Sequence, residues 1–174
     1  MNDNNLIGNS KVTLDFLGNE WHYECIGCAI AREDIKIPGG PIYNGEFLIL
    51  GADPEVPIPG FLVITFKRHI NSFSQTTKEE RKEIGNVILF AEKALKELNI
   101  TNEITLVQEE RSKHFHIWIF PNYPWMIEKF GKGVSYLRDI SSYAQDNINE
   151  DKIKEVLAVI KKVKEYFDNY YINE

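Results

Sequence analysis

The chain has 174 residues, of which 43% are hydrophobic and 26% charged, so it is long enough for one domain that buries a sizeable core. Its formal net charge of −6 excludes broad electrostatic binding to nucleic acid, which needs a basic face, but leaves room for a local cationic pocket for one small phosphate ligand. No apolar run approaches the ~18–20 residues that span a bilayer. The polar, Asn-rich segment Met1–Ser10 has no apolar stretch of the secretory kind, so we expect a loose start and a cytoplasmic protein.

Four apolar segments predict strands. Phe47–Leu50 and Phe61–Phe66 are rich in branched and aromatic residues, which is typical of buried strands. The ten residues between them contain three prolines and predict a stiff loop. Ile104–Gln108 and His114–Phe120 predict two further strands on either side of a short polar turn.

Two amphipathic helices are predicted as well. Thr77 and Glu80 form a capping-box pattern, in which each side chain bonds the backbone N–H of the other. The helix that they open carries one apolar stripe, which would face a sheet: Ile84, Val87, Ile88, Ala91, Ala94, Leu95 and Leu98. A second such stripe runs from Ile153 to Tyr170. Strands, a helix, a hairpin and further helices in this order predict an α+β domain with an antiparallel sheet.

The segment His114–Phe120 carries the most informative pattern. Side chains alternate between the two faces of a strand, and one face is apolar, made of Phe115, Ile117 and Ile119. The other face presents His114, His116 and Trp118 to a surface or a pocket. Three interpretations of the two imidazoles are open: solvated histidines on a half-buried strand, a metal site in which His-x-His offers two ring nitrogens to one ion, and nucleophilic catalysis by one imidazole on phosphorus.

The two cysteines of the chain, Cys25 and Cys28, form a Cys-x-x-Cys pair. In a reducing compartment this spacing indicates metal binding or redox chemistry before it indicates a structural disulfide. Two reduced thiols packed near a helix start are the plainer alternative. A redox dithiol is less favoured, because no thioredoxin-like βαβ pattern surrounds the pair.

Several of these segments together resemble the histidine-triad (HIT) family. His114–Phe120 is similar to the family motif of three alternating histidines, here His-x-His-x-Trp, and Cys25–Ile30 resembles the Cys-x-x-Cys segment that opens many members. Phe61–Ile64, which leads to the basic-basic-His turn Lys67–His69, also stands in the family's order, as do the capped helix and the strand at Ile104. The likeness covers residues 20–125. Residues 126–174 would be a C-terminal helical extension of one domain spanning 1–174.

The resemblance implies a fold and a site. The fold would be a HIT-like antiparallel sheet with one long packing helix, a short N-terminal helix and an additional C-terminal helix. His116 would be the nucleophile that attacks the α-phosphate of a nucleotide and forms a nucleotidyl-histidine. Asp53 would hold the ribose hydroxyls, Gln108 and Ser112 would contact phosphate, and Trp118 would lie against the same ligand. Arg111 and Lys113 are either further phosphate contacts or solvated turn residues.

The resemblance also implies one structural zinc per chain, because members that keep the Cys-x-x-Cys pair often bind one. The ligands here would be Cys25, Cys28, His69 and His114, a closed set of two thiolates and two imidazoles, which zinc favours for structure. A homodimer is expected on the same ground.

Two positions depart from the family pattern. Trp118 stands at the third histidine, and Gly60 stands near a further histidine that many members have before the apolar strand. An indole offers one N–H donor and no base. We therefore expect a nucleotide hydrolase or nucleotidyl transferase that acts on purine nucleotides or dinucleoside polyphosphates and is weakened by Trp118. The alternatives are a non-catalytic nucleotide-binding or signalling module and a zinc-dependent hydrolase that uses His114 and His116.

Overall fold

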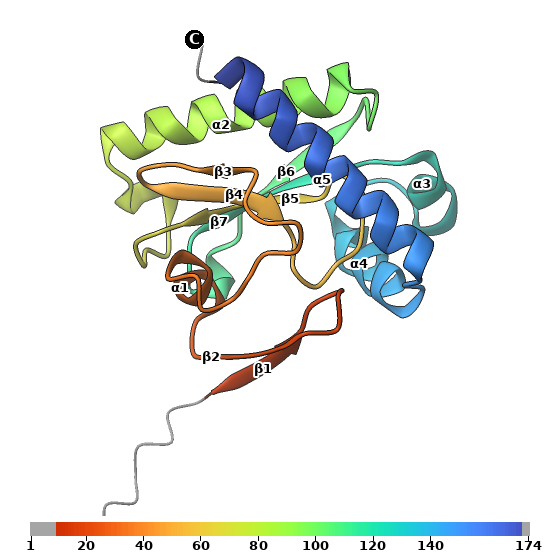
Figure 1. Ribbon diagram of the computed structural model, residues 1–174, viewed down its shortest axis with the longest axis horizontal. Coiled ribbons are helices and arrows are strands. Elements are labelled where there is room, and N and C mark those ends of the chain that lie inside the picture. The colour runs from red at the N-terminus through yellow and green to blue at the C-terminus, as the bar shows by residue number, and fades with distance from the viewer. Residues whose placement is uncertain (1–9, 172–174) are drawn as a thin grey trace, which may run out of the picture.

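The computed structural model describes residues 10–171 of the chain (Figure 1). Residues 1–9 and 172–174 lie outside this range, so the predicted loose start of the chain falls almost entirely outside the described residues. Between residues 10 and 171, no helix is both long and apolar enough to cross a membrane.

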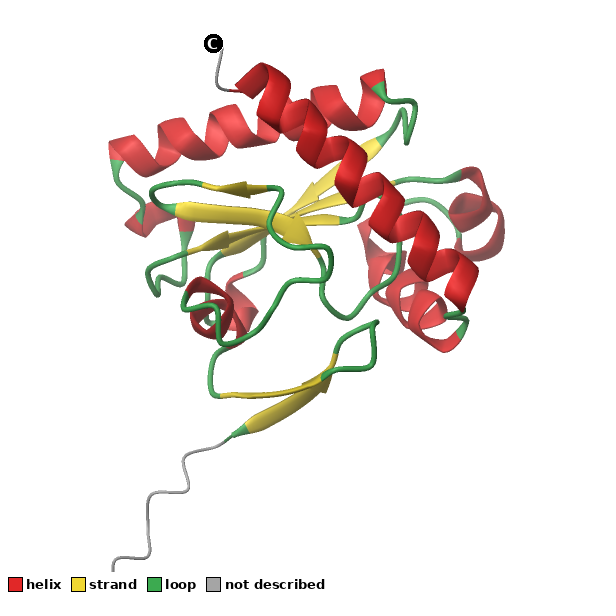
Figure 2. Cartoon of the chain, in the orientation of Figure 1, coloured by secondary structure: helices red, strands yellow, loops and turns green. Residues whose placement is uncertain are grey.

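A five-stranded antiparallel sheet forms the centre of the molecule (Figure 2). Its spatial order is β3-β4-β5-β7-β6. The strands are β3 (Tyr43–Asn44), β4 (Leu48–Ala52), β5 (Leu62–Phe66), β6 (Ile104–Val107) and β7 (His116–Pro121). The four strands predicted from the sequence are therefore present, with ends shifted by up to two residues. The register pairs Thr65 with His116 and Val63 with Trp118, so β5 and β7 present these side chains on one face.

Two long helices, α2 (Lys78–Glu97) and α5 (Glu150–Tyr170), cover the opposite face and cross over one another (Figure 1). The main core between sheet and helices holds Leu50, Ile64, Val87, Ile119 and Val163, each fully buried. Phe115 and Ile117 belong to the same core, as strand alternation predicts. The capping box at the start of α2 is formed: Thr77 Oγ1 accepts from the Glu80 backbone N–H, and Glu80 accepts from that of Thr77.

Three shorter helices lie against the face that carries His116 and Trp118. The short N-terminal helix α1 (Ile26–Ala31) packs Ile30 against Ile49 of β4. Two helices, α3 (Pro124–Phe130) and α4 (Leu137–Asp146), cover the far end of β7, where Phe120 is fully buried. The sequence predicted a helical extension over residues 126–174 but did not resolve these two helices within it. The pocket expected on this face is thus limited to the end of β7 nearer His116. The predicted α+β fold, with a long packing helix and a C-terminal helix, is confirmed.

A separate hairpin of β1 (Lys11–Leu14) and β2 (Glu20–Tyr23) precedes α1. Its turn is organised by Asp15, whose carboxylate accepts from the backbone N–H of Leu17 and Asn19 and from the indole of Trp21. The Phe16 backbone N–H donates to the Pro54 carbonyl oxygen at 2.9 Å. The hairpin is thereby fastened to the loop that follows β4 and carries Asp53.

Candidate metal centre and histidine pocket

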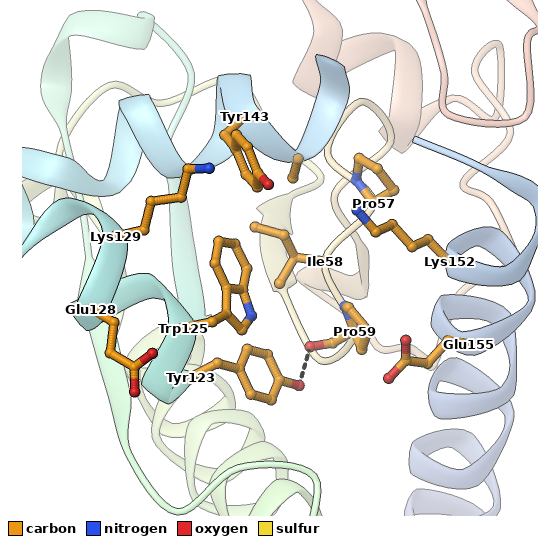
Figure 3. A pocket seen from close by; sticks show the side chains of 11 residues that line it. Pro57, Ile58, Pro59, Tyr123, Trp125, Glu128, Lys129, Tyr143, Lys152 and Glu155 are labelled. Carbon is orange, nitrogen blue, oxygen red and sulfur yellow. Dashed lines mark hydrogen bonds between the residues drawn. The ribbon is translucent and has the colours of Figure 1, made fainter. Parts of the chain in front are cut away.

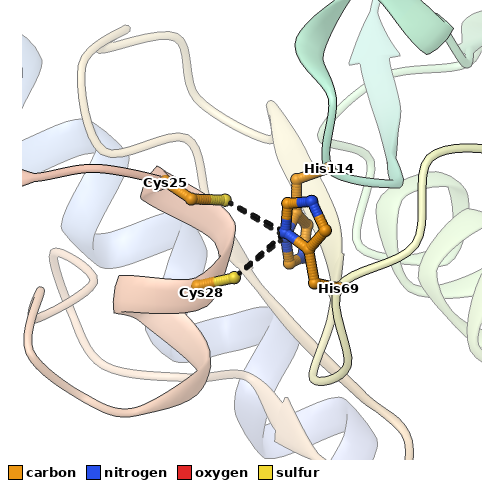
Figure 4. A group of neighbouring side chains, drawn as sticks. All are labelled: Cys25, Cys28, His69 and His114. Carbon is orange, nitrogen blue, oxygen red and sulfur yellow. Dashed lines mark hydrogen bonds between the residues drawn. The ribbon is translucent and has the colours of Figure 1, made fainter. Parts of the chain in front are cut away.

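Two thiols and two imidazoles meet at one point (Figure 4). Cys25 immediately precedes α1, at its N-cap position, and Cys28 lies in the first turn of the helix. His69 stands in the turn after β5, and His114 stands two residues before β7. The four candidate ligand atoms all lie within 4.8 Å of one another, so the fold brings together the whole set that the family resemblance implied for zinc.

The spacing of these atoms matches a tetrahedral zinc site. The Cys25 Sγ lies 3.6 Å from His69 Nδ1 and 3.3 Å from His114 Nδ1, and the Cys28 Sγ lies 3.2 Å and 3.5 Å from the same nitrogens. The two nitrogens are 3.3 Å apart. Zinc bonds of ~2.3 Å to sulfur and ~2.0 Å to nitrogen at a tetrahedral angle give a sulfur–nitrogen separation of about 3.5 Å and a nitrogen–nitrogen separation of about 3.3 Å. The donor set is therefore compatible with zinc in both chemistry and geometry.

His114 is held so that Nδ1 faces the thiols. Its Nε2 lies 2.9 Å from the Phe66 carbonyl oxygen, so the N–H sits on Nε2 and the lone pair on Nδ1. Burial lowers the pKa of His114, which favours the neutral, ligating form. A Cβ at Gly27 would lie 2.2 Å from His114 Cδ2; only glycine allows α1 to approach the imidazole this closely.

The turn that carries His69 is tied to the start of α2. Arg68 donates from Nε and Nη2 to the buried carboxylate of Glu80, at 2.6 Å and 2.8 Å. The hydrogen bonds from Arg68 lower the pKa of Glu80. The same carboxylate completes the capping box with Thr77, so one interaction fixes both the helix start and the approach to His69.

His116 lies beside the cluster with its ring oriented by the backbone. Its Nδ1 lies 3.0 Å from the His114 carbonyl oxygen and 3.2 Å from Ser112 Oγ, and Ser112 Oγ donates to the same carbonyl at 2.9 Å. A carbonyl oxygen only accepts, so Nδ1 carries the proton. The lone pair therefore sits on Nε2, which is the form of an imidazole that can act as a nucleophile.

A pocket of about 160 Å³ opens in front of this ring. Asp53, Ser112, His116 and Trp118 line it, together with residues of α1. The Asp53 carboxylate accepts from the backbone N–H groups of Glu55 and Val56, each at 2.9 Å. Burial raises the pKa of Asp53 to about 6, against the opposing effect of these two hydrogen bonds.

Trp118 separates this pocket from a second one. Its indole packs edge-on against Phe61, with ring centroids 5.3 Å apart, and lines both pockets. The second pocket, of about 480 Å³, contains Gln108 and Arg111. The structure thus places Gln108 on the other side of Trp118 from His116. No sequence signal distinguished the two sides, because the division depends on how the indole packs.

The other positions singled out in the sequence have local explanations. Lys113 adopts a left-handed conformation, with φ of 59°, at the end of the turn before β7, and lines neither pocket. Gly60 has φ of +76° in the turn before β5, a conformation that glycine adopts without strain. His22 is exposed and pairs with Glu20 at 2.9 Å, far from both imidazoles of the cluster in sequence and on a separate sheet.

A larger cavity, of about 710 Å³, lies elsewhere (Figure 3). The loop between β4 and β5 and the helices α3, α4 and α5 enclose it. Trp125 and Tyr143 line one side, and the Lys129 ammonium lies 3.8 Å from the centre of the Tyr143 ring. None of the predicted site residues reaches this cavity, and its lining comes from segments too far apart for sequence reasoning to assemble.

Comparisons with known proteins identify the fold. No protein-family model matches the chain, and no curated protein matches it. Several solved structures, however, match the chain in fold. A Zn-bound histidine triad family protein from Mycobacterium smegmatis is 17% identical with a TM-score of 0.54, over 82% of this chain and 96% of that chain.

Two further structures have a TM-score of 0.58. A Hit-like protein involved in cell-cycle regulation from Bartonella henselae is 19% identical, over 82% of this chain and 96% of that one. A hypothetical histidine triad nucleotide-binding protein from Sulfolobus tokodaii is 16% identical, over 83% of this chain and 94% of that one. The chain therefore has the histidine-triad fold, as the sequence motifs predicted.

The raised pKa of Asp53 gives a pH-dependent prediction. Its ordinary value is 3.8 and its value in the fold is about 6, so the neutral carboxyl stabilises the fold below pH 3.8 and this contribution is lost as pH rises through about 6. Asp53→Asn keeps an oxygen for the two N–H groups and removes the charge. We expect it to raise the free energy of unfolding at pH 7.5 by about 1–2 kcal/mol, discounted for partial solvent access, and to have little effect at pH 4.

Urea denaturation of both proteins across this pH range measures the effect. The exposed residue Asp168 provides the control, since Asp168→Asn should change stability by less than about 0.5 kcal/mol at either pH. An Asp53→Asn effect of equal size at pH 4 and pH 7.5 would contradict the assignment.

Proposed function

We propose that this chain is a histidine-triad family protein that binds a purine nucleotide or dinucleoside polyphosphate and cleaves it at the α-phosphate, with His116 as the nucleophile. The observation that carries the proposal is the orientation of His116: Nδ1 bonds the His114 carbonyl oxygen, which leaves the Nε2 lone pair free beside a pocket that also holds Asp53 and Ser112. The nucleotide-binding description of the Sulfolobus tokodaii protein agrees with this proposal.

The proposed reaction has two steps. In the first, the His116 Nε2 lone pair forms a bond to the α-phosphorus, and the bond from phosphorus to the leaving group breaks, its electron pair departing with that group. In the second, water attacks the phosphorus, the N–P bond breaks, and the nucleoside monophosphate leaves with a neutral imidazole restored. The sum is hydrolysis of one bond, with the two hydrogens of water shared between the products and solvent.

The neighbouring residues have defined parts in this proposal. Asp53 would accept hydrogen bonds from the ribose hydroxyls in its ionised form, which is favoured above its pKa of about 6. Ser112 Oγ donates to the His114 carbonyl oxygen; by turning this O–H toward the substrate it would donate to an oxygen of the α-phosphate instead. Trp118 has an N–H donor but no group that can give a proton to a leaving atom. Leaving groups that need a proton should therefore depart slowly, since general acid catalysis contributes typically ~10²–10⁴-fold.

We propose that Cys25, Cys28, His69 and His114 hold a structural zinc ion. Four protein ligands leave no open coordination position, so the ion would crosslink α1, the turn after β5 and the start of β7 without taking part in the reaction. The Zn-bound state of the Mycobacterium smegmatis protein agrees with this assignment. We also propose a homodimer in the cytoplasm, a compartment in which the two thiols stay reduced.

The structure bears differently on the two alternative functions, a non-catalytic nucleotide-binding module and a zinc-dependent hydrolase. A non-catalytic nucleotide-binding module is favoured by Trp118, which fills the position where an acid–base group would act. A zinc-dependent hydrolase would need His114 and His116 to converge on one open metal site. Here His114 Nδ1 faces the thiols and His116 Nδ1 faces a backbone oxygen, so the geometry does not favour that reaction.

The zinc proposal predicts one equivalent of zinc per chain in protein purified without added metal. Cys25→Ser and Cys28→Ser should each lower the zinc content and the melting temperature, because a structural metal contributes its binding free energy to folding. Elemental analysis and thermal unfolding measure both quantities. His22→Ala, which removes an exposed imidazole, should change neither. Less than a fifth of an equivalent in the parent protein would rule out the site.

The nucleophile proposal predicts a covalent adduct at His116. In a single-turnover assay with adenosine 5′-phosphoramidate and with a diadenosine polyphosphate, intact-protein mass spectrometry should detect adenylylated parent protein. His116→Ala should form no adduct, while its affinity for AMP changes by less than about tenfold, or ~1.4 kcal/mol. His22→Ala is the matched control, and Trp118→His should speed hydrolysis of the phosphoramidate.

The outcomes separate the two main functions. Turnover by His116→Ala at the parental rate would remove the nucleophile assignment. Binding of AMP with no adduct and no turnover in either the parent or Trp118→His would establish the non-catalytic module instead.

A further inference from the structure

The second pocket beside Trp118 contains a pair of arginines. It opens between β6, the turn Glu110–Ser112 and the start of α4, and its lining includes Gln108, Arg111 and Arg138. Because Trp118 is a wall of both pockets, the second pocket begins where the His116 pocket ends. A ligand whose phosphorus lies at His116 could therefore extend its leaving group past the indole into this space.

The two guanidinium groups converge from different elements on one carboxylate. Arg138 Nη2 lies 2.6 Å from a Glu109 oxygen, and Arg111 Nη2 lies 3.1 Å and 3.3 Å from the two Glu109 oxygens. Each arginine uses a single nitrogen for this contact, and its other guanidinium nitrogens have no hydrogen-bond partner among residues 10–171. Arg111, Arg138 and Glu109 together carry a net charge of +1, in a chain whose net charge is −6. Both guanidinium groups keep N–H donors that are free to bind another acceptor.

Helix stability does not explain the position of Arg138. It is the second residue of α4, and the positive end of the helix dipole disfavours a cation there. Surface ion pairs contribute little on their own, typically 0–1 kcal/mol. Guanidinium groups are, however, well suited to bind phosphate, which accepts several of their N–H donors at once.

The chemistry of the first pocket calls for such a group. Trp118 cannot protonate a leaving atom, so an amine leaving group would depart poorly. A phosphate chain departs as an anion and needs no proton, but its developing charge must be stabilised, and fixed cationic donors supply this stabilisation. The arginine pair thus compensates for the acid that is missing at position 118.

We propose that this second pocket is a leaving-group subsite for a phosphate chain, with Arg111 and Arg138 as its anion ligands. This inference rests on the proposed function of His116 and names its substrate class: nucleoside and dinucleoside polyphosphates rather than phosphoramidates. When His116 Nε2 bonds to the α-phosphorus, the bond between that phosphorus and the bridging oxygen breaks. The electron pair moves onto the departing phosphate, which the two guanidinium groups contact.

The first experiment compares leaving groups. We expect Arg138→Gln and Arg111→Gln to lower kcat/KM for diadenosine tetraphosphate by about 10–100-fold, in the range of removing one stabilising donor, and to change kcat/KM for adenosine 5′-phosphoramidate by less than about twofold. Arg138→Lys keeps the charge and should recover part of the loss. Lys96→Gln removes a paired cation on α2, on the opposite face of the sheet, and should affect neither substrate. Equal losses on both substrates, or none, would overturn the subsite.

The second experiment needs no turnover and separates the two proposals. Calorimetric titration with inorganic tripolyphosphate should show binding to the parent protein and to His116→Ala, weakened at least fivefold in Arg138→Gln. Absence of this binding would overturn the subsite. Arginine-dependent binding in a protein that forms no adduct would support the anion site and remove the catalytic function. If an adduct forms at His116 but tripolyphosphate binding does not depend on Arg138, the catalytic function would be supported and the arginine subsite would be overturned.

Discussion

His114 is the residue on which both parts of the site depend. Its Nδ1 contacts the two thiols, and its Nε2–H donates to the Phe66 carbonyl oxygen. The His114 carbonyl oxygen accepts a hydrogen bond from Ser112 Oγ and lies 3.0 Å from His116 Nδ1. The side chain therefore links the Cys/His cluster to the end of β5, and the backbone of the same residue determines which nitrogen of His116 is free. A shift of this one residue would disturb both the Cys/His cluster and the His116 ring.

The features predicted correctly from the sequence are those that depend on local patterns. Alternation in residues 115–119 places Phe115, Ile117 and Ile119 in the core, because a strand has a period of two wherever it lies. The capping box at Thr77 likewise forms from residues three apart. The four candidate metal ligands come from three separate segments, and only the resemblance to a family joined them before the structure did.

The remaining features depend on packing between distant segments. Helices α3 and α4 are short, and residues of both belong to a second core cluster that includes Phe61 and Phe120. This packing confines the exposed part of the His116 face and lets Trp118 divide one expected pocket into two. Gln108 therefore lies away from His116, and Arg138, from a stretch to which the sequence assigned no function, lies beside the predicted turn residue Arg111. Neither result has a signature in residue spacing.

The central claim is that His116 is held with the proton on Nδ1 and the lone pair on Nε2. Long-range ¹H–¹⁵N correlation NMR of the ¹⁵N-labelled protein measures this tautomer directly, with His116→Ala used to assign the signals. At neutral pH the account predicts a protonated Nδ1 and an unprotonated Nε2 for His116, and the opposite arrangement for His114, whose Nε2–H donates to Phe66. A His116 ring with its proton on Nε2 would contradict the account, because no nucleophilic nitrogen would then face the pocket.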